Sequence, residues 1–234
     1  MMFRRKSMRA KVLPLGAMGI RAWPEQNFLF EILMSMQEGE KWIYNHFIQM
    51  RGSHYIGYQW DAKDASMTFY PYAIHYLFPN MFDLCPFIDK YVLPRSFVFG
   101  LFSKFHSFVI SAIEEGFYIS TFLDQFFRDD MHGNHGYHHP TFIYGYDDAA
   151  KCVYITDNFE NGKYAKKQIS YDQLDTAFSL ITGQEWCYGV ILYGAKEKAY
   201  DFVPGYVKEQ LQDYLEPKRG ICYMDRTLCP DPFH

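Results

Sequence analysis

The chain lacks the features that mark several large classes of protein. Its 234 residues include 23 basic and 27 acidic residues, so it has no positive excess and a nucleic-acid partner is not expected. The longest apolar runs, such as residues 97–102, are far shorter than the ~18 residues that a membrane span requires. No apolar segment follows the basic opening at residues 1–6, so no secretory signal is expected. We therefore expect a cytoplasmic protein without a membrane partner.

Cysteine is also scarce, and its spacing is irregular. The five cysteines form no Cys-x-x-Cys pair, which argues against a zinc ribbon or a redox pair and fits a reducing compartment. Four histidines cluster in one segment without a carboxylate or cysteine at ligand spacing, so we interpret this segment as a solvated loop. We expect no metal and no other cofactor. The histidines are His132, His135, His138 and His139.

Aromatic residues, by contrast, are abundant. They make up 20% of the chain, with 22 Phe, 20 Tyr and 4 Trp, and hydrophobic residues make up 49%. Aromatic side chains bury large areas and favour strands, so this composition predicts a sheet-rich core and a wide aromatic groove. The length suits a single domain over residues 1–234.

The order of the expected elements places helices before strands. Apolar residues at three- and four-residue spacings predict a helix from residue 23, with Pro24 in its first turn and Gly39 as a break. A further helix is expected over residues 97–115, capped by Gly116. Strands are then expected at 117–122, 141–146, 152–156, 163–170 and 188–193, with helices at 171–181 and 204–216. This order predicts an α+β domain, with helices over 23–115, a sheet over 116–200 and a helix and tail over 201–234.

One hairpin in the expected sheet brings a histidine and an aspartate to the same end. His139 opens one strand, Asp147 and Asp148 form the turn, and Asp157 closes the partner strand. In such a hairpin the Asp157 carboxylate can orient the His139 imidazole and stabilise its protonated form. The pair would be the base and the orienting group of a nucleophilic triad. Its ordinary alternative is a strand-end histidine and a turn aspartate with no chemical role.

The same hairpin resembles a known superfamily. The segment from His139 to Asp148 ends in Gly145, Tyr146, Asp147 and Asp148 and is followed by a strand that ends at Asp157. This pattern is similar to that of papain-like cysteine peptidases of the bacteriocin-leader-peptidase branch. The nearest family is that of the N-terminal domain of butirosin biosynthesis protein H, and the resemblance covers residues 110–180. It implies a papain-like fold, with N-terminal helices packed on an antiparallel sheet and a groove between them.

The resemblance requires a nucleophilic cysteine at the start of the first long helix, where the helix dipole lowers the thiol pKa. No cysteine precedes Cys85, and Asn27 is the best candidate for the position, ahead of Ala17 and Ala22. Three accounts of Asn27 stay open: a substitution introduced to silence the enzyme, a natural pseudoenzyme, or a simple N-cap with the nucleophile elsewhere. Cys85 is the alternative nucleophile, although no helix follows it directly.

The resemblance also implies a reaction. Its nearest family moves acyl groups from carrier-protein thioesters to amines in natural-product biosynthesis, with the phosphopantetheine arm as part of the substrate. We expect His139 as general base and acid, Asp157 as its orienting group, and an acyl or peptidyl carrier protein and a small amine as partners. Gln26 and Arg21 are weak candidates for the oxyanion donor. The alternatives are an inactive papain-like binding module and a peptidase of leader peptides.

Overall fold

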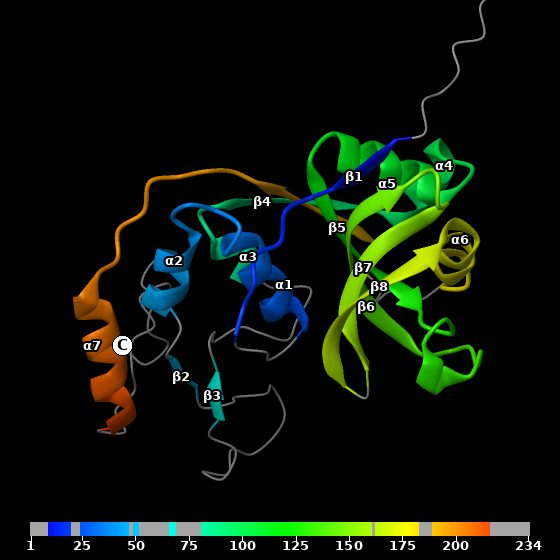
Figure 1. Cartoon of the computed structure of the whole chain (residues 1–234). Coiled ribbons are helices and arrows are strands. Elements are labelled where there is room, and N and C mark those ends of the chain that lie inside the picture. The colour runs from blue at the N-terminus through cyan, green and yellow to red at the C-terminus, as the bar shows by residue number, and fades with distance from the viewer. Residues whose placement is uncertain are drawn as a thin grey trace, which may run out of the picture. The chain divides into compact units, whose positions relative to one another are not determined.

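The computed structural model describes residues 9–19, 24–46, 49–51, 66–68, 81–160, 162–182 and 189–215. The chain divides into two compact units. Figure 1 shows the helices and strands of the chain, coloured from the N-terminus in blue to the C-terminus in red. The first unit comprises Met1–Ile32 and Ile88–Lys196, and the second comprises Leu33–Phe87 and Glu197–His234. The expected functional residues that the structure describes belong to the first unit, apart from Cys85 in the second.

An antiparallel sheet forms the centre of the first unit. Its strands follow the order β4-β9-β5-β6-β7-β8, and β1 pairs with the far half of β6 (Figure 1). The longest strand, β6, therefore has β5 and then β1 along one side, and β7 along the other side from Phe142 to Asp147. The strands are β1 (Ala10–Val12), β4 (Ile88–Leu93), β5 (Phe117–Asp124), β6 (His138–Asp147), β7 (Cys152–Glu160), β8 (Lys163–Ser170) and β9 (Val190–Ala195).

Helix α1 (Pro24–Leu33) packs on one face of this sheet through Phe28. The Phe28 ring stacks on Phe142 of β6, with 4.3 Å between the ring centroids, and meets Tyr118 of β5 edge-on at 5.8 Å. All three rings are buried, so this aromatic cluster anchors the first helix to the two central strands. The buried Glu31 carboxylate lies 3.4 Å from Lys166 of β8, which balances its charge.

The opposite face carries α4 (Arg95–Leu101), α5 (Phe105–Glu114) and α6 (Tyr171–Ser179). Ser120 of β5 is the register partner of Phe142, so its side chain is on the face that α1 covers. Thr121, the next residue, points to the opposite face, and Arg95 of α4 donates to its hydroxyl there. The Phe178 ring of α6 stacks on Phe105 of α5 at 3.7 Å. Ser170 and Gln173 form a capping box that starts α6. The sheet is therefore covered by helices on both faces.

The described residues of the second unit include three helices and a two-stranded antiparallel sheet. Asn45 joins two distant segments of it, since its amide donates to the Asp201 carbonyl and its Oδ1 accepts from the Val203 amide, each at 2.9 Å. The elements are α2 (Gly39–His46), β2 (Gln49–Arg51), β3 (Ser66–Thr68), α3 (Met81–Leu84) and α7 (Pro204–Leu215).

The α+β class and the antiparallel sheet are confirmed, and three expectations need correction. The helix expected over 97–115 is two helices, α4 and α5, bent by 95°. Residues 88–93 were not recognised as a strand, yet they form the edge strand β4. The first helix starts at Pro24, so Asn27 lies inside its first turn and is not its N-cap. No single helix in the described ranges is long and apolar enough to cross a membrane.

Gly145 is required where β1 meets β6. The register of β6 with β7 shifts between Ile143 and Gly145, and a Cβ at Gly145 would lie 2.8 Å from the Lys11 carbonyl oxygen. We predict that Gly145→Val lowers the free energy of unfolding by about 1–3 kcal/mol, because β1 must move. Urea denaturation measures this loss. Gly100→Ala is the control, because a Cβ there meets nothing within 4 Å, and an equal loss in both variants would contradict the prediction.

Candidate functional site

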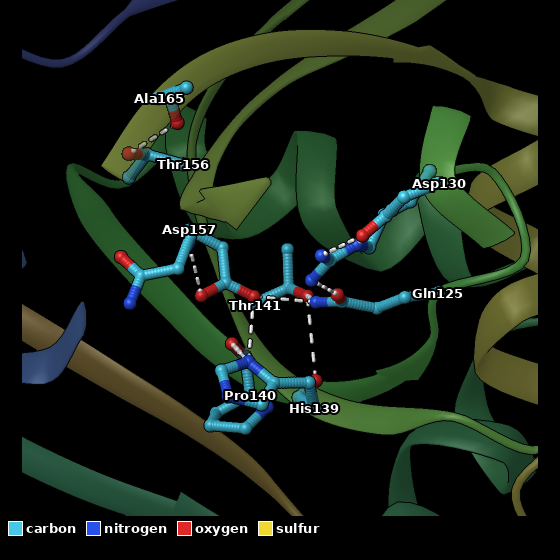
Figure 2. Close-up of polar contacts among 10 residues, drawn as sticks. Gln125, Asp130, His139, Pro140, Thr141, Thr156, Asp157 and Ala165 are labelled. Atoms are coloured by element: carbon cyan, nitrogen blue, oxygen red, sulfur yellow. Dashed lines mark hydrogen bonds and ion pairs between the residues drawn. The ribbon is translucent and has the colours of Figure 1, made fainter. Parts of the chain in front are cut away.

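The structure brings His139 and Asp157 into direct contact. His139 is the second residue of β6, and Asp157 lies on β7 two residues beyond Ile155, the register partner of Ile143. The His139 Nδ1 atom lies 2.7 Å from the Asp157 Oδ2 atom (Figure 2). The Asp157 side chain is fully buried, while 28% of the His139 side chain is exposed. The pair therefore has one end in the core and one end open to a substrate.

The contacts of Asp157 fix the tautomer of the neutral imidazole. Its Oδ1 accepts from the Asn158 amide at 2.6 Å, and its Oδ2 accepts from the Gln125 side-chain amide. A carboxylate has only acceptor atoms, so Asp157 accepts from His139. The His139 proton is therefore on Nδ1, which leaves the Nε2 lone pair as the base. No described residue forms a hydrogen bond or ion pair with Nε2.

The sequence analysis missed the residues that hold Asp157. Gln125 follows β5 directly and is fully buried, and its Nε2 also donates to the Thr141 hydroxyl at 3.0 Å. Arg128 donates to the Gln125 Oε1 atom at 3.1 Å and pairs with Asp130 (Figure 2). Arg128 begins the polar segment before β6 and Gln125 precedes it by three residues, and Gln and Arg are ordinary surface residues in such positions. No sequence signal distinguished them, because the contacts of Gln125 with Asp157 and of Arg128 with Gln125 exist only after β5, β6 and β7 have paired.

Protonation of His139 is favoured by its surroundings. Burial is the largest single effect and lowers the pKa of His139, but the hydrogen bond and the charge of Asp157 outweigh it. The more distant Glu25 carboxylate adds to the same direction. The pKa of His139 is therefore raised above its ordinary value of 6.5. An imidazole of this kind both accepts a proton readily and returns it to a leaving group.

The first turn of α1 lies near the start of β6. Glu25 acts electrostatically on His139, and Phe28 stacks on Phe142, three residues along β6. Side chains alternate along a strand, so Thr141 and Asp157 face away from the side on which Phe142 meets α1. His139 has the same parity as Thr141 along β6, and the electrostatic effect of Glu25 is the observation that links the first turn of α1 to it. Asn27 lies in this first turn and is 1% exposed.

The described cysteines are poor nucleophiles. Cys152 pairs in register with Asp147 at the turn of the β6–β7 hairpin, the opposite end from His139 and Asp157. Burial raises the pKa of its thiol, which disfavours the reactive thiolate. Cys85 is buried in the second unit, so the structure gives no support for its role beside His139. Cys187, Cys222 and Cys229 lie outside the described residues, as do Arg21 and Ala22, and Ala17 is exposed.

Two of the four clustered histidines, His135 and His138, lie beside Asp124. Asp124 accepts from the Phe126 and Gly136 amides, and the rings of His135 and His138 lie 3.7 and 3.6 Å from its oxygens. Among the described residues, no group of three or more His, Cys, Asp or Glu side chains is arranged to hold a metal ion. Asp147 accepts from the Ala149 and Ala150 amides, in agreement with its expected place in the turn.

Comparisons with known proteins give no match: no family model, no curated protein and no solved structure is similar to this chain at a significant level.

The pKa of His139 can be checked by NMR titration. We predict a value above 6.5 in the native chain and a value below 6.5 in Asp157→Asn, because that variant keeps the burial and loses the charge. Since folding raises this pKa, His139 stabilises the fold below pH 6.5, and the contribution is lost as the pH rises through the folded-state value. Urea denaturation should show His139→Gln losing more stability at acid than at alkaline pH. The reverse order would refute the assignment.

Proposed function

We propose that this chain carries an acyl-transfer site of the cysteine-protease type, on a papain-like domain, with Asn27 at the nucleophile position. The reaction moves an acyl group from a carrier-protein thioester to an amine. The observation that carries the proposal is the 2.7 Å contact between His139 and the buried Asp157, which leaves Nε2 as a free base. The electrostatic effect of Glu25, two residues before position 27, on His139 supports the role of this position.

The covalent route needs a thiol at position 27. A thiolate there would attack the thioester carbonyl carbon, and protonated His139 would give its proton to the departing pantetheine thiolate. The new thioester would then be attacked by the amine, with His139 removing the amine proton and position 27 leaving as thiolate. The partial positive charge at the start of α1 would stabilise both the thiolate and the oxyanion.

The native chain has an amide at this position, and an amide does not form such an acyl intermediate. We propose that the native chain transfers the acyl group directly. The amine attacks the bound thioester, His139 takes the proton from its nitrogen at Nε2, and the pantetheine thiolate leaves and is then protonated. Asp157 stabilises the imidazolium that forms.

Two buried amides support a ligand rich in amide groups. Gln26, in the first turn of α1, has neither its Nε2 nor its Oε1 hydrogen-bonded to any residue of the structure. The Oδ1 of Asn158, next to Asp157, is likewise buried and unpaired in the described chain. Buried unpaired polar atoms cost about 1–3 kcal/mol each, so they mark places where a ligand or water completes the hydrogen bonding. The two amides of a phosphopantetheine arm offer donors and acceptors of this kind.

Intact-protein mass spectrometry tests the proposal. The native chain and Asn27→Cys are incubated with the benzoyl thioester of N-acetylcysteamine, which reproduces the end of a pantetheine arm. We predict a benzoyl adduct on Asn27→Cys and none on the native chain, and a slower reaction when His139→Gln is added. With benzylamine present, the native chain should form the amide without an adduct.

The controls use features of the same unit. Ala17→Cys places a thiol at an exposed position outside any helix and should stay unmodified. His106→Gln removes a second His–Asp pair, in which His106 Nδ1 lies 2.9 Å from Asp175, and should leave the adduct unchanged. Equal labelling of Ala17→Cys and Asn27→Cys would disprove the role of position 27. Thioester binding by the native chain without amide formation would identify a binding module instead.

A further inference from the structure

We propose that Arg128 positions both members of the His139–Asp157 pair, through Gln125 on one side and through Tyr137 on the other. Arg128 touches neither reacting group in this arrangement, so it is a positioning residue. Arg128 contacts both Gln125 and Tyr137. Gln125 in turn contacts Asp157, and Tyr137 contacts His139, so the contacts that start at Arg128 reach both members of the pair. The loop that connects β5 to β6 thereby becomes part of the site.

The first path sets the orientation of the Gln125 amide. The Arg128 guanidinium has only donors and occupies the Oε1 end of Gln125, at 3.1 Å. The Nε2 end must then point to the acceptors Asp157 and Thr141 (Figure 2). Without Arg128 the amide is free to turn its oxygen toward the carboxylate, which would repel it. Arg128 therefore decides which end of Gln125 meets Asp157.

The second path holds the imidazole plane. The Tyr137 ring lies nearly parallel to the His139 ring, with 5.8 Å between centroids and 9° between planes. The Arg128 guanidinium carbon lies 5.4 Å from the centroid of the Tyr137 ring, within the range of a cation–π interaction. Tyr137 is 42% exposed, and its ring lies between the contacts with Arg128 and with His139. The stacking keeps Nδ1 in line with Asp157.

Arg128 can contact Gln125 and Tyr137 at the same time because Asp130 fixes the orientation of its guanidinium group. The Nε and terminal nitrogen atoms donate to the two Asp130 oxygens at 2.8 and 2.6 Å, and the other terminal nitrogen is left for Gln125. The Arg128 side chain is 9% exposed, whereas Asp130 lies at the surface. A lysine offers a single point charge and cannot make these three directed bonds at once.

The inference is tested by the tautomer of His139, read from proton–nitrogen NMR correlations of the ¹⁵N-labelled chain above the His139 pKa. We expect the Nδ1–H form in the native chain. In Arg128→Met the ratio of the Nδ1–H to the Nε2–H form of His139 should fall by on the order of 10- to 100-fold. The reason is that His139 and Asp157 are no longer held in line, so the hydrogen bond from Nδ1 to the charged Asp157 carboxylate is lost. Gln125→Met should shift the ratio the same way, and Arg128→Lys should give an intermediate value.

Two controls separate positioning from general destabilisation. His106 also directs Nδ1 to a carboxylate, Asp175, so its Nδ1–H signal in the same spectrum is an internal reference that should not change. Arg95→Met removes another arginine, which packs over Phe178 and bonds to β5, and should lower stability while leaving the His139 tautomer intact. If Arg128→Met does not fold, Gln125→Met carries the test.

An unchanged Nδ1–H signal of His139 in folded Arg128→Met or Gln125→Met would overturn the inference. The value of this positioning for catalysis rests on the proposed acyl transfer. The NMR measurement reads the imidazole itself and needs no acyl donor, so failure of the positioning and failure of the proposed function are distinguishable. In the Asn27→Cys background, loss of positioning should slow benzoylation by on the order of 100-fold.

Discussion

The buried carboxylate of Asp157 is the constraint on which the site depends. An ionised group without exposed surface must be surrounded by donors, and here a backbone amide, the Gln125 amide and the His139 imidazole supply them. Each donor comes from a different position in the pairing of β5, β6 and β7. The sheet register, the hydrogen bonds of Asp157 and the tautomer of His139 are therefore linked.

Different elements pack on the two faces of the sheet that carries His139 and Asp157. One face is fixed by Phe28, which packs α1 on Phe142 in the middle of β6. The other face is fixed by the aromatic packing of α5 and α6 and by the loop that contains Arg128. His139 lies at the start of a central strand, where it contacts Tyr137 of this loop and feels the charge of Glu25 in α1. A strand-end histidine can be reached by a helix and by a substrate while its partner stays in the core.

Local patterns in the sequence accounted for much of this structure. The strand at 163–170 and the helix break at Gly39 follow from alternation and from a single residue type, and the structure has both. The contact of His139 with Asp157 also followed from hairpin geometry, because a tight turn fixes which residues are opposite. The edge strand at 88–93 was missed because its half-exposed Tyr and Val give no clear alternation, and only pairing with β9 makes it a strand.

By itself the sequence determined the α+β class, the main strands and helices after residue 116 and the pairing of His139 with Asp157, since these depend on residues that are close along the chain or joined by one short turn. Tertiary structure alone decided the roles of Gln125, Arg128 and Tyr137, and the position of Asn27 inside the first turn of α1 rather than at its cap. The physical reason is that their partners lie on other strands. The direction of an amide or the plane of a ring is set by those partners and carries no mark in the sequence.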